Sequence, residues 1–135
     1  MKPRKNPRSE RGASALEFAL VLPVLLLILF GIIEYGWVLT SQIVLTNAAS
    51  EGARAGIKAE DDAEALYYAT KAVMEAYWLG DLDEELVVTE IIPAGEYPRR
   101  IVVEVPKAPY NPLTGFLPAE LVPQTLSAQA VMAFP

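Results

Sequence analysis

The sequence contains no cysteine and no histidine. Without these residue types the chain has no disulfide framework, no thiol nucleophile, no haem attachment and no zinc site built on thiolate or imidazole ligands. Every catalytic triad that needs imidazole as its base is excluded as well. The remaining acid–base candidates are scattered carboxylates without evident pairing, so the sequence favours a protein that is not an enzyme and needs no cofactor.

Charge is distributed unevenly along the 135 residues. Residues 1–11 hold five basic residues and one acidic residue, a net charge of +4, whereas the remainder holds six basic and 16 acidic residues, a net charge of −10. A basic flank before an apolar segment predicts a cytoplasmic N terminus and places the acidic remainder across the membrane. That acidity also argues against a nucleic-acid partner.

One long apolar run follows the basic start. Residues 13–33 carry a single charge, at Glu17, and at ~1.5 Å per residue they are about long enough to cross a ~30 Å hydrocarbon layer. No small-residue cleavage site follows the run, so we expect the segment to be retained. Tyr35 and Trp37 come where interfacial aromatic side chains lie. We therefore predict one transmembrane helix over residues 13–39, in the cytoplasmic membrane and in contact with the lipid bilayer.

Two residues of this helix each have two interpretations. Pro23 removes a backbone hydrogen bond and should kink or loosen the helix over residues 19–23, although membrane helices tolerate proline in general. Glu34 ends the apolar run and is most simply an interfacial residue. A role for Glu34 in subunit pairing is the alternative that we favour less.

The helical pattern continues beyond the membrane over residues 40–59. Small residues recur there at three- and four-residue spacing, which lets another helix approach closely. That helix belongs either to a neighbouring subunit or to the distal domain of the same chain, and both alternatives stay open. An unbroken helix from residue 13 to about residue 58 would be on the order of 70 Å long. The small residues are Ala49, Gly52, Ala53 and Gly56.

The distal region, residues 60–135, reads as a small α+β domain. Asp61 and Glu64 form a capping-box pattern that opens a helix through about Leu79, with Gly80 as its stop. Alternating apolar residues then predict strands, and Pro93, Gly95 and Pro98 predict a hairpin between the first two. Five prolines make residues 106–124 an ordered irregular excursion with one helical turn near Ala119. The predicted strands are residues 86–92, 101–105 and 125–134, which form a three-stranded antiparallel sheet packed on helices.

Two further groups of residues could form sites. The acidic residues Asp81, Asp83, Glu84 and Glu85 offer oxygen ligands for calcium, but they lack the glycine and the ligand spacing of an EF-hand, so we favour a solvated turn. The tyrosines Tyr67, Tyr68 and Tyr77 occur at helical spacing and are better explained as core and domain-contact residues than as a ligand cage.

Residues 11–18, RGASALEF, look like a class III prepilin junction. A basic leader ends in Gly12, the small residue Ala13 follows, and Glu17 is five positions into the mature chain. Together with the apolar run through Trp37, this segment resembles the TadE-like proteins, the minor pilins or pseudopilins of the tight-adherence (Flp) pilus. The resemblance is close over about residues 9–58 and is limited to the general layout in the remainder.

The resemblance implies processing and assembly. A prepilin peptidase would remove the leader, residues 1–12, by cutting between Gly12 and Ala13. Glu17 would pair with the freed amine of its own chain or of a neighbouring subunit, and a carboxylate in an apolar segment does need such a partner. The alternative for Glu17 is a side chain that reaches the cytoplasmic interface. The implied partners are the prepilin peptidase, other pilin or pseudopilin subunits and the tight-adherence assembly machinery.

The sequence therefore predicts a membrane-anchored structural subunit, with incorporation into an extracellular pilus left open. The alternative is a single-pass, signal-anchored extracytoplasmic binding module that is neither processed nor polymerised. Sequencing of the N terminus separates the two.

Overall fold

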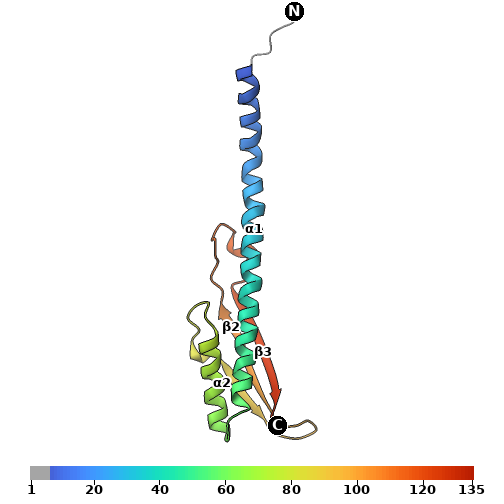
Figure 1. Cartoon of the computed structure of the whole chain (residues 1–135), viewed down its shortest axis with the longest axis vertical. Coiled ribbons are helices and arrows are strands. Elements are labelled where there is room, and N and C mark those ends of the chain that lie inside the picture. Colours follow the sequence, from blue (N-terminus) through green and yellow to red (C-terminus); the bar gives the residue numbers. More distant parts are fainter. Residues whose placement is uncertain (1–6) are drawn as a thin grey trace, which may run out of the picture.

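A computed structural model describes the backbone of residues 7–135 and the side chains from residue 12 onward. Its first helix, α1 (Pro7–Gly56), has 50 residues and is therefore about 75 Å long. Figure 1 shows the distal domain packed along the C-terminal half of this helix, while the N-terminal half projects alone. The long helix predicted from the sequence is confirmed.

The start of α1 differs from the prediction. The sequence predicted a helix from residue 13, yet α1 begins at Pro7, within the predicted leader. Proline is tolerated in a first helical turn, where the backbone N–H has no acceptor in the helix. The part of the predicted leader before Pro7 lies outside the described residues.

The second helix, α2 (Asp62–Ala76), begins as predicted. The Asp61 carboxylate accepts a hydrogen bond of 2.7 Å from the backbone N–H of Glu64 and so caps the first turn. The helix ends at Ala76, earlier than the predicted Leu79, because Tyr77 turns to an extended backbone and buries its ring. Gly80 is therefore not the residue that stops α2.

The three strands form one antiparallel sheet, as predicted, and their order in it is β1-β2-β3. They are β1 (Val88–Ile92), β2 (Arg100–Pro109) and β3 (Thr125–Ala133). Ile101 pairs with Ile91 on one side and with Met132 on the other, so these apolar side chains share the face toward the helices. The first two strands form the expected hairpin.

The central strand is longer than predicted because it continues through two prolines. Pairing with β1 ends at Glu104, so Pro106 and Pro109 fall where β2 has only β3 as a neighbour. A proline lacks the N–H of a ladder hydrogen bond and is tolerated at such an open edge. A register shift between Val105 and Ala108 accommodates the change.

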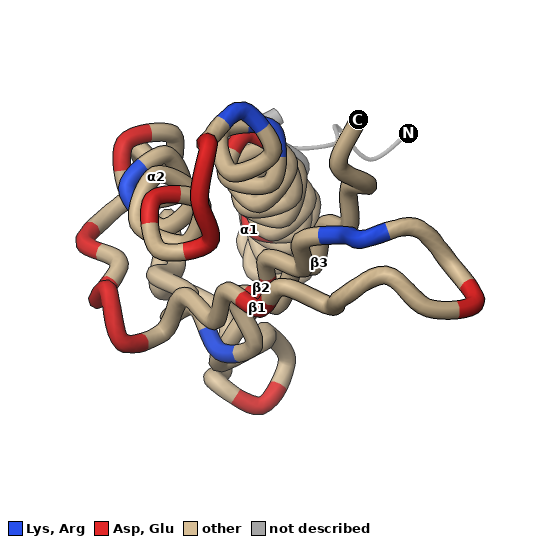
Figure 2. The backbone as a smooth tube through the Cα atoms, turned by 90° about the horizontal axis from the view of Figure 1, so that it is seen from below, with Lys and Arg blue, Asp and Glu red and all other residues tan. Residues whose placement is uncertain are grey.

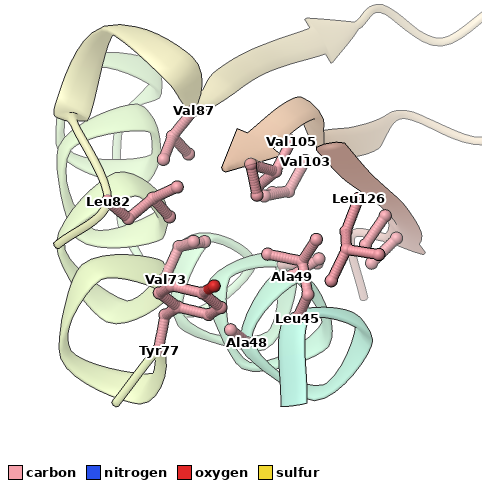
Figure 3. Close-up of a cluster of buried hydrophobic side chains, with 14 of the residues drawn as sticks. Leu45, Ala48, Ala49, Val73, Tyr77, Leu82, Val87, Val103, Val105 and Leu126 are labelled. Carbon is pink, nitrogen blue, oxygen red and sulfur yellow. The ribbon is translucent and has the colours of Figure 1, made fainter. Parts of the chain in front are cut away.

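The core lies between the sheet and the two helices. Figure 3 shows side chains from α1, α2 and the strands meeting there, among them Leu45, Val73 and Val103, all fully buried. Figure 2, along the axis of α1, shows acidic residues spread around the outline of the distal domain. Acidic residues therefore lie on several sides of the distal domain and do not gather in one place.

The connection from β2 to β3 returns toward the middle of α1. It includes the predicted helical turn, η2 (Ala119–Leu121), and an earlier turn, η1 (Glu84–Leu86), precedes β1. In Figure 1 this connection is the segment that reaches furthest along α1 toward the N terminus. We call residues 110–117 the clamp loop, because its contacts hold it against α1.

Candidate functional site

Apart from the tip of the clamp loop, which contacts Phe30, the N-terminal half of α1 has no other described part of the chain packed around it. Its most apolar 18-residue stretch is entirely unburied, and the helix is long and apolar enough to cross a membrane. Gly12, Ala13 and Glu17 are exposed and lie near the N-terminal end of α1. A membrane or other helices must cover such a surface, since water does not solvate it favourably.

Pro23 lies inside α1, and the helix continues through it without a break. The kink that we expected is not evident in Figure 1. Pro23 instead borders an apolar groove beside Leu27 and Phe30, on the side of the helix that the clamp loop approaches.

Glu34, at the end of the apolar run, is the most buried of the polar side chains in the described residues, with 0% of its surface exposed. Its Oε1 accepts hydrogen bonds from the Tyr110 hydroxyl at 2.7 Å and the Leu113 N–H at 3.0 Å. Its Oε2 accepts from the Thr114 N–H at 2.9 Å and the Thr114 hydroxyl at 2.6 Å. The carboxylate therefore binds the clamp loop of its own chain.

This arrangement affects Tyr110 in turn. Burial raises the pKa of the Tyr110 phenol, and the hydrogen bond to Glu34 and the charge of that carboxylate raise it further. The phenol thus stays protonated and remains a donor. Glu34 is occupied by four donors, so it is not available as a general acid or base.

Two aromatic residues of α1 complete the clamp. The Tyr35 hydroxyl donates to the Leu121 carbonyl at 2.6 Å, and the Trp37 indole N–H donates to the Asn111 carbonyl at 3.1 Å. The sequence assigned Glu34, Tyr35 and Trp37 to the membrane interface and missed that all three bind the same returning segment. One feature of the sequence could have indicated this contact: residues 108–119 carry no charge, which suits a segment that lies against an apolar helix.

The small-residue stripe packs within the chain. A Cβ atom added to Gly52 would clash with Val73 and lie 2.9 Å from the Ala69 carbonyl oxygen of α2. Gly56 is similarly close to Ile101 and to the Ala65 carbonyl. Ala49 and Ala53 are fully buried in the same core. Of the two alternatives left open, these contacts favour the distal domain of the same chain.

The other candidate sites bring no ligand set together. Asp81, Asp83, Glu84 and Glu85 are exposed, and among the described residues no group of three or more such side chains could hold a metal ion. Tyr77 is buried as predicted, but Tyr67 and Tyr68 are exposed and contact each other edge to face. The prediction that these two belong to the core is wrong, because both side chains lie exposed on the surface of α2.

The fold and these contacts define a class: a single-pass, membrane-anchored protein with a small α+β domain clamped to its anchor helix. Residues 12–54 match the family model of TadE-like proteins, which confirms the resemblance found in the sequence. This family is structural and pilus-associated. The match covers α1 almost to its end and leaves the distal domain outside it. No curated protein and no solved structure matches the chain.

Proposed function

We propose that the chain is a minor pilin or pseudopilin, a structural subunit for assembly of a tight-adherence (Flp) pilus. A prepilin peptidase of the cytoplasmic membrane cuts it between Gly12 and Ala13. The mature helix crosses that membrane over residues 13–39, continues beyond it over residues 40–59 and carries the domain of residues 60–135 on the outer side. Its partners are other pilin subunits and the assembly machinery.

The observation that carries this proposal is the bare N-terminal half of α1 within the TadE-like segment. Apart from the tip of the clamp loop, the distal domain packs on the C-terminal half, and residues such as Leu20, Val24 and Leu27 are exposed along the other half. A helix of this kind can rest in lipid as a stored subunit and can later pack against the same helix of other subunits. An ordinary anchor needs only the first of these abilities.

The junction supports processing. A Cβ atom added to Gly12 would meet nothing within 4 Å beyond its own stretch of helix, so no distant described part of the chain covers the junction. A glycine at the boundary of leader and helix also opens easily to the extended form that a protease binds.

Intact-mass analysis of the protein from its native host tests the cut. We expect a chain that starts at Ala13, and we expect Gly12→Leu to leave the leader in place without unfolding the distal domain, which lies far along α1. Gly31→Leu is the matched control, because Gly31 also has free space around it but lies outside the junction. Retention of Met1 in a host that has the peptidase would contradict the proposal and favour the unprocessed binding module.

A further inference from the structure

The tip of the clamp loop exposes apolar side chains beside the membrane helix. The ring of Phe116 stacks on the ring of Phe30, with centroids 4.4 Å apart and planes inclined by 14°. Even so, 69% of Phe116 and 54% of Leu113 remain exposed. Exposed apolar side chains of this size mark a surface that another apolar phase covers.

The loop tip and α1 enclose an open apolar groove of ≈ 270 Å³. The groove lies on the N-terminal side of Glu34, within the stretch of α1 that crosses the membrane, so its walls continue the lipid-facing surface of the helix. Its walls carry aliphatic and aromatic side chains without a charge. They are Pro23, Leu26, Leu27 and Phe30 of α1 with Phe116 and Leu117 of the loop.

The tip lies at a shallow depth when depth is measured from the end of the apolar run. Glu34 ends that run, and Phe30 precedes it by one helical turn, which is about 6 Å along the axis at ~1.5 Å per residue. Amphipathic elements that lie in the membrane interface bury their apolar face by about 5–10 Å. The loop also has no charged residue between Lys107 and Glu120. A tip at the level of Phe30 therefore reaches the boundary of headgroups and acyl chains without carrying a charge into it.

Irregular backbone is costly in lipid because its N–H groups lack acceptors. Here the chain supplies acceptors. Glu34 accepts from the N–H groups of Leu113 and Thr114, the Thr114 hydroxyl oxygen accepts from the N–H of Phe116, and Pro112 and Pro118 have no N–H to satisfy. The one described residue with a positive φ, Gly115 at 65°, makes the turn that these bonds require.

We propose that residues 112–117 insert into the interfacial layer of the same membrane that α1 crosses, with Leu113 and Phe116 against the lipid acyl chains. The protein then holds the membrane at two points, the helix and the loop tip, and Glu34 is the positioning residue that fixes one to the other. This insertion depends on the membrane anchor and not on processing or pilus assembly.

Depth-dependent fluorescence quenching tests the insertion on the full chain. The sequence has no cysteine, so Phe116→Cys gives a single attachment point for an environment-sensitive dye. The protein is placed in phosphatidylcholine vesicles at fewer than one chain per vesicle, which removes any second copy. Two positions of similar exposure serve as references: Tyr97→Cys, in the hairpin between β1 and β2 and 61% exposed, and Leu27→Cys, in the anchor helix and 62% exposed.

We expect the dye at position 116 to be quenched by lipids that carry a nitroxide high on the acyl chain and to be protected from aqueous iodide, as at position 27. The dye at position 97 should respond to iodide alone. Leu113→Cys should reproduce the result of position 116. Iodide quenching at 116 and 113 equal to that at 97 would overturn the proposal. Protection that develops only at high protein density would also overturn it, because a second copy of the chain would then be the occupant of the groove.

Discussion

Glu34 illustrates how a charge can be buried at the end of an apolar helix segment without a basic partner. All four groups that donate to it are neutral, two from the backbone and two from hydroxyls. A buried carboxylate is costly unless hydrogen bonds replace its hydration, and bonds to a charged acceptor contribute about 1.5–3 kcal/mol each. The sequence placed Glu34 at the end of the apolar run correctly, but its partners lie more than 70 residues away in sequence, which no local pattern reveals.

The clamp should therefore contribute to stability through Tyr110. Tyr110→Phe removes one donor and leaves the carboxylate buried, so we expect a loss of about 2 kcal/mol in the free energy of unfolding of the distal domain. Tyr97→Phe is the control, and because Tyr97 is exposed its loss should stay within about 0.5 kcal/mol. Denaturant unfolding in detergent micelles, followed by near-UV circular dichroism, measures both. Equal stability of the two variants would mean that Glu34 does not depend on this hydroxyl.

The raised pKa of Tyr110 predicts a loss of stability at alkaline pH. The folded protein favours the neutral phenol, because burial and the Glu34 carboxylate both oppose its ionisation. The resulting stabilisation is complete below the ordinary tyrosine pKa of 10.0 and is lost as the pH rises above it toward the folded value. Phenolate absorbance measures the titration. The folded wild type and Tyr110→Phe should ionise the same number of tyrosines near pH 10, and a smaller number in the variant would contradict the assignment.

The pairing of α1 with α2 depends on small residues in both helices. Gly52 and Gly56 of α1 face Ala65 and Ala69 of α2, so backbone and Cβ atoms make the contact. The sequence pattern predicted close approach of a helix, and it predicted the N terminus of α2 from the Asp61 cap. It could not identify the partner helix, because small stripes serve contacts within and between chains equally.

Gly52→Ala tests this contact. Alanine is the better helix former by about 1 kcal/mol, but the added methyl group would overlap Val73 and the Ala69 carbonyl, and overpacking typically costs about 1–3 kcal/mol. We expect a net loss of stability, because the obstacle includes the backbone of α2. Gly36→Ala adds the same atom where nothing lies within 4 Å and should be neutral or slightly stabilising. Thermal unfolding of the two variants decides the point, and a stabilised Gly52→Ala would show that α2 moves freely.

Those features of the sheet that depend on neighbouring residues in the sequence could be predicted. Alternation of apolar residues located all three strands, and turn residues located the hairpin between β1 and β2. The extension of β2 through Pro106 and Pro109 was not predictable, because proline disfavours a strand unless one edge is open, and only the tertiary pairing reveals that β1 ends at Glu104. The same tertiary information was needed to place the excursion after β2 against α1.

At the scale of the whole molecule, the chain divides into a clamped half and a bare half. The domain, its core and the clamp loop occupy α1 from about Phe30 onward, whereas the helix before Phe30 has no packing partner in the chain apart from the tip of that loop. The acidic distal domain and the first described turn of α1, at Pro7, lie at opposite ends of this axis. The sequence predicted the length, the apolar character and the charge of each segment. Each of these properties is the total of contributions from single residues and does not depend on tertiary contacts.

Within the unpacked part of α1 before Phe30, Glu17 is the polar residue that we expect to take part in subunit assembly. Its side chain is exposed, and none of the described residues pairs with it in a hydrogen bond or an ion pair. If the Ala13 amine of another subunit is its partner, Glu17→Val should leave membrane insertion intact, because the helix becomes no less apolar. Registration between subunits should fail, since loss of one member of a buried ion pair costs about 3–5 kcal/mol, or less where water enters.

The experiment compares Glu17→Val with Glu51→Gln, which removes an exposed carboxylate further along the same helix, where it pairs only with Arg54. Both variants should accumulate in the membrane at the wild-type level. Cross-linking between subunits and the yield of sheared fibres should fall at least about tenfold for Glu17→Val, as a loss of more than about 1.4 kcal/mol implies, and should stay unchanged for Glu51→Gln. Because the two variants lose the same charge, a defect confined to Glu17→Val locates the effect at the start of the helix. Equal fibre yield from both would favour a carboxylate that only reaches the cytoplasmic interface, and the single-pass binding module would then explain the chain better.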